Sequence, residues 1–391
     1  MKILLATDLY TPAVNGVVTS TMSLKKSLEG LGHEVRVLTL GEIDYVLPDR
    51  SVYAMSSLSI NKIYPGARVC LFNDRPILRE IIRWNPDVIH TQSEFSTFRM
   101  AKYIAHLLNI PIVHTYHTIY EDYTHYFSPS KKTGKKIVSL ISKKILSSTE
   151  EVIVPTEKVA RLLNSYHVDV PVTVIPTGIE LDKFQDKPSK EELVSLKRQY
   201  NIPKDAFLLV SIGRLGKEKN IEEIISFLSM IKLKPYLLIV GDGPNRYHLE
   251  ELVKDLELGD RVKFTGMIHP NEVSKYYHLG NVFVCASTSE TQGLTYIEAL
   301  ASGLPALARE DESIQHVIIK GKTGFQYRNF KEFEAYLYTL MTKKEICQEM
   351  SHNATKITVA HYSSEAFGQH VNKIYERALA THYEHQMMQM N

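Results

Sequence analysis

The sequence predicts an α/β protein made of two doubly wound domains, each a parallel sheet covered by helices. Short apolar runs rich in β-branched residues alternate with longer segments of helical periodicity, which is the pattern of parallel βαβ units. The chain has 391 residues, enough for about two domains. A polar, turn-rich stretch over 182–188 separates two series of these runs, and we place the domain boundary near residue 180.

The alternation assigns each element in order. The expected strands of the first series are 2–7, 33–40, 86–91, 111–116, 151–155 and 172–175, and those of the second are 206–212, 236–240, 262–265, 282–286 and 304–308. The segments between them are expected to be helices. We therefore expect domains over 1–180 and 181–362, followed by a helical segment, 363–391, that packs back on the first domain.

Charge and cysteine content exclude several classes of function. The chain has 46 Lys+Arg against 44 Asp+Glu, a net charge of +2, which is no footprint for nucleic acid. Its 3 cysteines are far apart and lack metal-ligand spacing, as expected in a reducing compartment. No apolar run approaches the roughly 20 residues that span a bilayer, and the first one is too short for a secretory signal. We expect a cytoplasmic protein that touches a membrane only from its surface.

Two loops after strands carry groups suited to phosphate. Gly16 lies in a loop that leads into a helix, where free backbone N–H groups favour an anion; an ordinary βα turn is the alternative. Arg214 and Lys219 follow the strand 206–212, at the edge where open sheets bind ligands, and their charge suits a diphosphate. A solvated surface loop is the alternative there. No G-x-G-x-x-G sequence occurs, which argues against hydride transfer.

Two glutamates in the second domain are the most informative pair. Glu290 is expected in a loop after a strand, and Glu298 about two turns into the next helix, roughly 12 Å along it. This separation is too great for an acid/base pair and suits contacts to two parts of one long ligand. Gly293 exposes backbone amides beside Glu290. No D-x-D motif occurs, so we expect no metal site. Arg214, Lys219 and backbone amides would instead stabilise the negative charge of a diphosphate.

A histidine and several tyrosines follow the strand 111–116 in the first domain. His117 ends that strand, and Tyr120, Tyr123 and Tyr126 come shortly after it. Aromatic rings with polar tips suit a sugar or an amphipathic acceptor. The alternative is a structural histidine.

The segment 131–146 predicts a basic amphipathic helix. One arc of about 100° holds Lys132, Lys135, Lys136 and Lys143, with Ile137, Val138, Ile141 and Ile145 opposite. Such a helix favours an anionic membrane surface. The alternative is a helix docked on its own domain with a solvated lysine face.

Taken in chain order, these motifs resemble the retaining family 4 glycosyltransferases of the GT-B fold. The matching segments are 15–17, 213–214 with Lys219, 240–244, 264–266 and 290–305. The resemblance implies two Rossmann-like domains facing a central cleft, a nucleotide-sugar donor, and retention of the anomeric configuration without a demonstrated protein nucleophile.

The resemblance also implies a role for each matched residue. Arg214 and Lys219 would hold the donor diphosphate, Glu298 the ribose hydroxyls, and Glu290 with the amides of Gly293, Leu294 and Thr295 the transferred sugar and its phosphate. Gly16 would approach the phosphate, Met267 and Ile268 would meet the base, and His117 would contact the sugar near the reacting centre.

Within this family, the segments 15–20 and 114–126 and the lysine-rich helix are similar to those of bacterial diacylglycerol glucosyltransferases. This implies transfer of α-glucose from UDP-glucose to 1,2-diacylglycerol, without metal or other cofactor, at the inner face of the plasma membrane. The product, monoglucosyldiacylglycerol, would serve membrane glycolipids or lipoteichoic acid anchors. Thr291 and Gln292 depart from the family pattern, in which an aromatic residue often follows the first glutamate.

Three alternatives stay open at this point. The first keeps the chemistry but uses galactose, or another lipid or a soluble acceptor. The second is an epimerase of the same fold that acts on a UDP-sugar without an acceptor. The third is a non-catalytic module that binds or activates another transferase.

Overall fold

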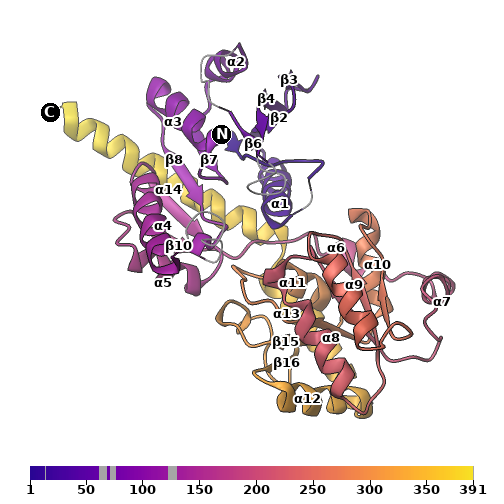
Figure 1. Ribbon diagram of the computed structural model, residues 1–391. Coiled ribbons are helices and arrows are strands. Elements are labelled where there is room, and N and C mark those ends of the chain that lie inside the picture. Colours follow the sequence, from indigo (N-terminus) through magenta and orange to yellow (C-terminus); the bar gives the residue numbers. More distant parts are fainter. Residues whose placement is uncertain (14, 61–67, 71–75, 122–129, 391) are drawn as a thin grey trace. The chain divides into compact units, whose positions relative to one another are not determined.

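The computed structural model describes residues 1–13, 15–60, 68–70, 76–121 and 130–390. Helices and strands alternate along the chain, which divides into two compact units (Figure 1). Unit 1 comprises Met1–Gly178 and Ser364–Asn391, and unit 2 comprises Ile179–Ser363. The predicted α/β class with two parallel sheets is confirmed.

Unit 1 is built on an 8-stranded sheet with the order β10-β9-β8-β7-β1-β2-β4-β3. Neighbouring strands are parallel except for β3 and β4. The strands are β1 (Lys2–Ala6), β2 (Glu34–Gly41), β3 (Tyr45–Val46), β4 (Val52–Ser56), β7 (Val88–Thr91), β8 (Ile112–Thr115), β9 (Glu151–Val154) and β10 (Val172–Val174). A separate ribbon pairs β5 (Leu58–Ser59) with β6 (Arg68–Val69).

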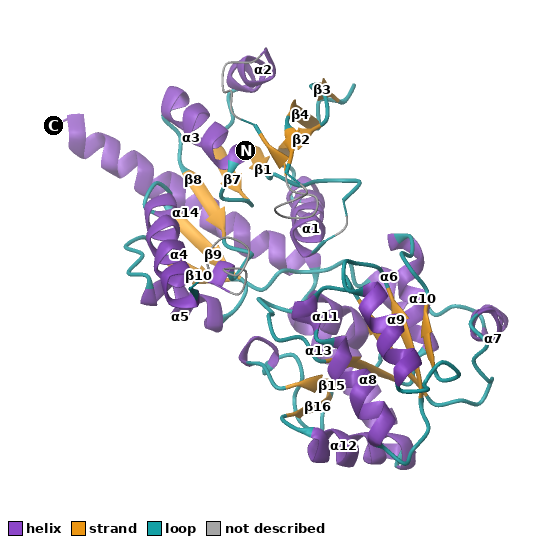
Figure 2. Ribbon diagram, in the orientation of Figure 1, coloured by secondary structure: helices purple, strands orange, loops and turns teal. Residues whose placement is uncertain are grey.

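Helices cover both faces of this sheet (Figure 2). They are α1 (Gly16–Gly30), α2 (Pro76–Trp84), α3 (Ser96–Leu108), α4 (Lys131–Leu146), α5 (Glu157–Ser165) and α14 (Ser364–Met390). Successive side chains of a strand point to opposite faces. Accordingly, Leu4 packs in a core cluster with residues of α2 and α3, whereas Ile3 and Leu5 pack in a second cluster with residues of α1 and α14.

The C-terminal helix α14 belongs to the core of unit 1. Phe367, Val371, Ile374 and Tyr375 are buried with residues of α1 and β1. Burial of a large apolar side chain stabilises a fold by about 2 kcal/mol. Polar contacts fix the register of the helix: the Arg377 guanidinium pairs with Glu151 of β9. The prediction that the C-terminal helix packs on the first domain is therefore confirmed.

Unit 2 is built on a 6-stranded, all-parallel sheet with the order β13-β12-β11-β14-β15-β16. The strands are β11 (Leu208–Ile212), β12 (Tyr236–Val240), β13 (Val262–Phe264), β14 (Val282–Cys285), β15 (Ala306–Arg309) and β16 (Gly324–Tyr327). The helices are α6 (Asp182–Gln185), α7 (Lys190–Gln199), α8 (Ile221–Met230), α9 (Arg246–Asp255), α10 (Val273–Leu279), α11 (Leu294–Ala301), α12 (Phe330–Thr342) and α13 (Lys344–His361).

Each sheet has a point at which the strand order reverses. In unit 2 the reversal lies between β11 and β14, and in unit 1 between β1 and β7. Ligands of doubly wound proteins bind outside the carboxyl ends of the strands at this point, because the loops there diverge and leave a crevice. The two reversals therefore mark where functional side chains are expected in each unit.

The sequence missed five strands, β3 to β6 and β16. All five strands have only two to five residues, and β16 begins with Gly324. Single-sequence patterns carry little signal for such strands because their pairing partners, not their own composition, define them.

Gly368 offers a test of the packing between α14 and α1. A Cβ at this position would lie 2.6 Å from Cβ of Ser27 and 2.0 Å from its Oγ. We expect Gly368→Val to lower the free energy of unfolding by about 2 kcal/mol through overpacking. The readout is urea unfolding followed by the fluorescence of Trp84, the 1 tryptophan of the chain, which lies in unit 1. Ala380→Val, at an exposed position of the same helix, is the matched control. Equal midpoints for both variants would contradict the close approach.

Candidate functional site

The reversal point of unit 2 brings together two residues that are far apart in sequence. Nζ of Lys219, after β11, donates to Oε1 of Glu290, after β14, at 2.6 Å. Glu290 is buried, with 6% exposure. The N–H of Thr288 also donates to the carbonyl oxygen of Glu218 at 2.9 Å, which fastens the two loops together. The structure thus joins the cation and the carboxylate that the sequence singled out separately.

Arg214 lies in the same loop as Lys219 and is partly exposed. Its guanidinium pairs with Glu218, four residues further along the chain, at 2.7 Å. Arg214 and Lys219 are therefore each held by a carboxylate. An anionic ligand at this edge would compete with those carboxylates for the same cations.

Gly293 shapes the loop that follows Glu290. It precedes α11 with φ of 77°, a left-handed conformation that side-chain-bearing residues rarely adopt. A Cβ there would lie 2.6 Å from the ring of Tyr296. Gly293, the N-cap of α11, has no side chain, and the N–H groups of Leu294 and Thr295 stand at the start of the helix. This is the local arrangement that binds anionic groups.

Glu298 lies closer to the helix start than the sequence suggested. Because α11 begins at Leu294, Glu298 is little more than one turn into the helix rather than two. The hydroxyl of Tyr277 donates to its Oε2 at 2.7 Å. Burial raises the pKa of Glu298 to about 7, and the hydrogen bond from Tyr277 opposes part of that rise. The protonated and ionised forms of Glu298 are therefore both populated near neutral pH.

The remaining residues proposed for the donor follow other strands. Met267 and Ile268 come after β13; Met267 is 68% exposed, and Ile268 packs partly against a core cluster. Gly16 is the first residue of α1 in unit 1, where the side chain of Asn15 caps the helix by accepting from Val18 N at 2.9 Å. Among the residues that the structure describes, no polar partner defines a role for Gly16, Met267 or Ile268.

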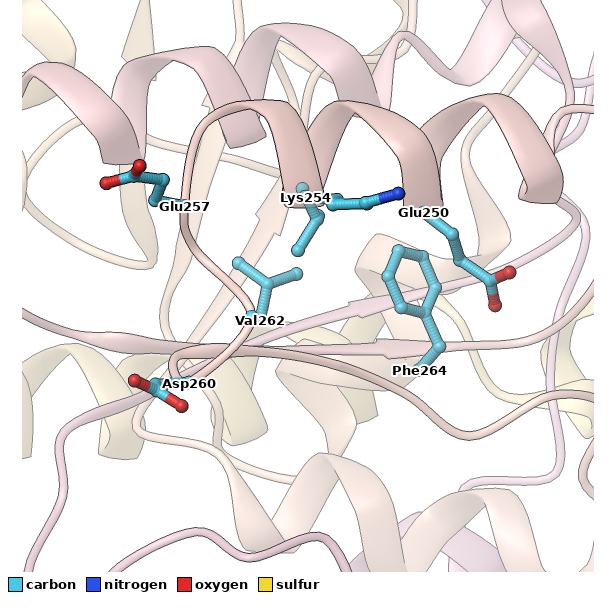
Figure 3. A pocket seen from close by; sticks show the side chains of 8 residues that line it. Glu250, Lys254, Glu257, Asp260, Val262 and Phe264 are labelled. Atoms are coloured by element: carbon cyan, nitrogen blue, oxygen red, sulfur yellow. The ribbon is translucent and has the colours of Figure 1, made fainter.

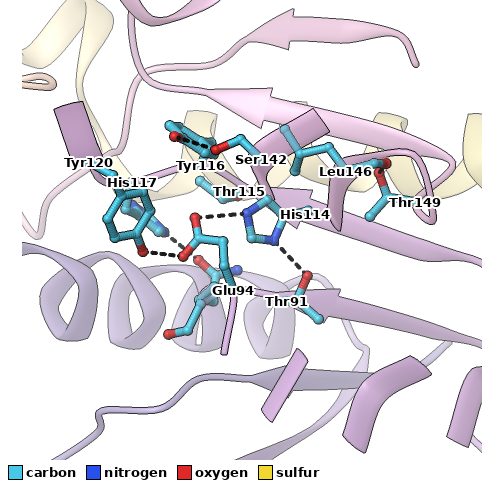
Figure 4. Close-up of polar contacts among 12 residues, drawn as sticks. Thr91, Glu94, His114, Thr115, Tyr116, His117, Tyr120, Ser142, Leu146 and Thr149 are labelled. Atoms are coloured by element: carbon cyan, nitrogen blue, oxygen red, sulfur yellow. Dashed lines mark hydrogen bonds and ion pairs between the residues drawn. The ribbon is translucent and has the colours of Figure 1, made fainter. Parts of the chain in front are cut away.

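The reversal point of unit 1 holds a buried polar cluster (Figure 4). Glu94, after β7, faces two partners: Nε2 of His114 at 3.3 Å and the hydroxyl of Tyr120, which donates to Oε2. Nδ1 of His114 lies 2.8 Å from the hydroxyl of Thr91. His117 points toward the same cluster from the end of β8. Tyr123 and Tyr126 lie outside the described residues.

His117 is a neutral imidazole with one defined tautomer. Its Nε2 lies 2.7 Å from Oε1 of Gln92, and because a carbonyl oxygen only accepts, Nε2 carries the proton. Burial, and next the charge of His114, lower the pKa of His117 to about 3. Nδ1 is therefore left as a hydrogen-bond acceptor at neutral pH.

Family models match both halves of the chain. The model described as Glycosyltransferase Family 4 matches residues 14–183, and the one described as Glycosyl transferases group 1 matches residues 195–357. An alpha-monoglucosyldiacylglycerol synthase of Streptococcus pneumoniae is 36% identical over 97% of this chain and 86% of its own length. The chain belongs to the family 4 glycosyltransferases. A second alpha-monoglucosyldiacylglycerol synthase, of Acholeplasma laidlawii, is 33% identical over 96% of both chains.

Solved structures show the fold of this glycosyltransferase. A crystal structure of Anabaena HepE in complex with UDP and glucose superposes with a TM-score of 0.76 at 16% identity, covering 96% of this chain and 100% of the other. Sucrose-phosphate synthase from Thermosynechococcus elongatus superposes with a TM-score of 0.75 at 20% identity, covering 97% of this chain and 100% of the other. The predicted GT-B fold is confirmed.

Sequence reasoning missed three residues of the unit 1 cluster of this glycosyltransferase. Asp8 follows β1; Thr97 donates to its Oδ1 from the backbone N–H and the hydroxyl, at 2.8 and 2.9 Å. Its Oδ2 is buried and has no hydrogen-bond partner among the described residues. Burial, with a smaller contribution from Glu94, raises the pKa of Asp8 to about 6.

Glu94 and Phe95 follow β7, and Phe95 is 60% exposed beside the Tyr120 ring, at 5.8 Å between centroids. Their position directly after buried strands was the available signal.

The lysine-rich helix α4 is oriented differently from the expectation. Val138 is buried, but Ile137 and Ile141, expected on the same side, are 39% and 51% exposed. The inward row is instead Val138, Ser142 and Leu146. The sequence prediction used only the positions of charged and apolar residues. Packing instead buries the polar residue Ser142, because its hydroxyl oxygen lies 3.2 Å from that of Tyr116.

Two further features of the described residues bear on the site. A hollow of about 430 Å³ lies between α9 and β13 at the outer edge of the unit 2 sheet (Figure 3), with a lining that includes Glu250, Lys254 and Phe264. None of the residues assigned above to the donor, the acceptor or the membrane lines it. Within the described ranges, no helix has the length and apolar character to cross a bilayer.

The neutral state of His117 predicts a dependence of stability on pH. Its pKa of about 3 in the fold lies below the ordinary 6.5, so the unfolded chain takes up a proton first as pH falls. The folded state thus loses stability below about pH 6.5. We expect His117→Gln to reduce the fall in unfolding temperature between about pH 7.5 and about pH 5, measured by scanning calorimetry. His106→Gln, exposed on α3, is the control and should behave as wild type. An unchanged fall in the His117 variant would contradict the assignment.

Proposed function

We propose that this glycosyltransferase transfers glucose from UDP-glucose to the free hydroxyl of 1,2-diacylglycerol, with retention of the α configuration. The observation that carries the proposal is the 36% identity, over 97% of the chain, to an enzyme named for monoglucosyldiacylglycerol synthesis. The ion pair of Lys219 with Glu290 at the strand reversal of unit 2 supports it, because a diphosphate sugar requires a cation and a hydroxyl acceptor side by side.

The donor is proposed to bind unit 2. Arg214 and Lys219 hold the diphosphate, and Glu290 accepts hydrogen bonds from hydroxyls of the glucose. The amides of Gly293, Leu294 and Thr295 stabilise the phosphate next to the sugar, aided by the positive end of α11. Glu298 accepts from the ribose hydroxyls, Met267 and Ile268 meet the uracil, and Gly16 approaches the phosphate.

The proposed reaction breaks one bond and forms one at the anomeric carbon. The bond from that carbon to the phosphate oxygen breaks, and UDP leaves with the electron pair. The diacylglycerol oxygen then attacks the same face of the sugar, and its proton passes to the departing phosphate. Charge that develops on UDP is stabilised by Arg214, Lys219 and the amides at the start of α11. No metal is invoked, and activity in excess EDTA tests this part of the proposal.

The acceptor and the sugar face are proposed to involve unit 1. Nδ1 of neutral His117 accepts a hydrogen bond from a glucose hydroxyl near the reacting carbon. Tyr120, held by Glu94, and the exposed ring of Phe95 contact the glyceride, since an aromatic face suits its apolar part. Tyr123 and Tyr126 are assigned to the same acceptor.

The proposed location is the cytoplasmic face of the plasma membrane, where diacylglycerol is found. Lys132, Lys135, Lys136 and Lys143 of α4 are assigned to an anionic membrane surface. Each lysine near such a surface contributes about 1 kcal/mol of binding free energy. The protein would then act as a peripheral membrane enzyme.

The proposed function predicts the products of the reaction. With UDP-glucose and diacylglycerol in mixed detergent micelles, we expect UDP release that requires diacylglycerol and an α-glucosyl lipid, identified by NMR and unaffected by EDTA. Glu290→Gln should lower kcat/KM at least about 100-fold because it weakens a contact to the reacting sugar. Glu251→Gln, exposed on α9, is the matched control and should retain wild-type turnover.

Each other outcome removes a defined part of the proposal. Wild-type turnover by the Glu290 variant removes that residue from the site. UDP binding without any glucosyl lipid removes the acceptor, and lipid product from UDP-galactose alone removes the donor. Isomerised UDP-sugar without UDP release would show an epimerase instead.

The proposed role of Glu298 predicts that donor binding depends on pH. Because the pKa of Glu298 is raised to about 7, the carboxylate that accepts from ribose is lost as pH falls through that value. We expect calorimetry to show about tenfold weaker UDP binding by Glu298→Gln above about pH 8, from the lost charge-assisted bond. The difference from wild type should vanish below about pH 6. UDP itself titrates in this range, but its effect cancels in the ratio. A ratio independent of pH would contradict the role of Glu298.

A further inference from the structure

The loop after β11 carries a carboxylate that has no part in the proposed function. Glu218 lies between Arg214 and Lys219 in the sequence, and it pairs with the Arg214 guanidinium at 2.7 Å. An ionised carboxylate only accepts hydrogen bonds, as the oxygens of a diphosphate do, so Glu218 has no favourable contact to offer that ligand. The carboxylate of Glu218 therefore occupies a cation that the diphosphate needs.

The backbone of Glu218 is fixed by hydrogen bonds. Its carbonyl oxygen accepts from the N–H of Thr288 at 2.9 Å and from the Thr288 hydroxyl at 3.2 Å, which joins the loops after β11 and β14. Glu218 also lies in a short 3-10 helix, η2 (Lys217–Lys219), where the N–H of Lys219 donates to the carbonyl oxygen of Gly216 at 3.1 Å. A ligand that binds at this edge can thus displace the side chain of Glu218 while the loop keeps its shape.

The side chain of Glu218 folds back over Gly216 to reach Arg214. A Cβ at Gly216 would lie 2.2 Å from Oε1 of Glu218, the same oxygen that accepts from Arg214. The side chain of Arg214 is 36% exposed and that of Glu218 18%. The guanidinium is therefore accessible from solvent while it holds the carboxylate, and the pair is open to a competing anion.

We propose that Glu218 sets the affinity for nucleoside diphosphate by competing with it for Arg214. The diphosphate takes the guanidinium when it binds, and the carboxylate takes it back when UDP leaves. The proposal rests on the proposed function for the identity of the ligand, and goes beyond it by naming the group that opposes ligand binding. Its consequence is turnover, because a product held by cations and helix amides leaves more readily when a carboxylate replaces it.

The charge of Glu218 has no comparable purpose in the fold. Partly exposed ion pairs contribute little to stability, and the backbone bonds to Thr288 already fix the loop. A diphosphate offers Arg214 a bidentate and more highly charged partner than one carboxylate, so it wins the competition. The gain on binding is nevertheless reduced by the ion pair that breaks and by repulsion from the displaced carboxylate.

The test compares UDP binding to wild type and to Glu218→Gln by calorimetry at about pH 8 and about 50 mM salt. We expect the variant to bind UDP about fivefold more tightly, because glutamine keeps the size of the side chain and removes its negative charge. The difference should shrink when salt is raised to about 0.5 M, since it is electrostatic. Uridine, which has no phosphate, should bind both chains equally in ligand-observed NMR.

Weaker or unchanged UDP binding by the Glu218 variant overturns the proposal. Weaker binding would instead make Glu218 a positioning residue for Arg214. Glu332→Gln is the matched control: Glu332 pairs with Arg328, also four residues away, at 2.6 Å, but beside β16 at the edge of the sheet. It should bind UDP as wild type does. Unfolding temperature verifies that each variant is folded.

A second variant separates contact with Arg214 from charge alone. Gly216 has φ of −101° and ψ of 160°, an extended conformation that alanine adopts without strain. The added Cβ of Gly216→Ala would displace the carboxylate of Glu218 from its present position but keep its charge in the loop. We expect this variant also to bind UDP more tightly than wild type. Unchanged binding would overturn competition for Arg214 as the cause.

The outcomes for Glu218 and for the reaction are distinguishable. Tighter UDP binding by Glu218→Gln, without any glucosyl lipid formed by wild type, removes the proposed acceptor and leaves the competition. Glucosyl lipid formed by wild type, with equal UDP affinities of the two chains, removes the competition and leaves the proposed function. Failure of UDP to bind wild type at all removes both.

Discussion

Burial of the central parallel strands is the constraint on which both polar clusters depend. Because parallel strands end at a common edge, side chains directly after them are brought together whatever their separation in sequence. Lys219 and Glu290 are 71 residues apart and meet at 2.6 Å after β11 and β14. Asp8 and Glu94 follow β1 and β7 in the same way. Each unit thus presents its polar groups where its own strand order reverses.

The same burial sets the charge state of these groups. Transfer from water disfavours the ionised form, so the pKa rises for Glu298 and Asp8 and falls for His117. Near neutral pH, His117 is therefore uncharged and offers Nδ1 as an acceptor. Glu290 lies against Lys219, and this pairing keeps a cation at the edge where a diphosphate is proposed to bind.

The helix α4 shows how one element serves two environments. Its inward row, Val138, Ser142 and Leu146, fits a core that needs a hydroxyl beside Tyr116. Its outward side leaves Leu140 in water.

The sequence by itself determined the α/β class, most buried strands and the strand-end residues Arg214, Lys219, Glu290 and His117, since hydrophobic periodicity and position after a strand are local properties. It did not identify β4, β16, Asp8 or Glu94, whose significance lies in what they contact. It also misplaced the inward side of α4, because periodicity counts Ser142 as polar while packing buries it against Tyr116. Tertiary structure alone decided which strand ends meet, which cations are already paired and which isoleucines face water, because these depend on neighbours distant in the chain.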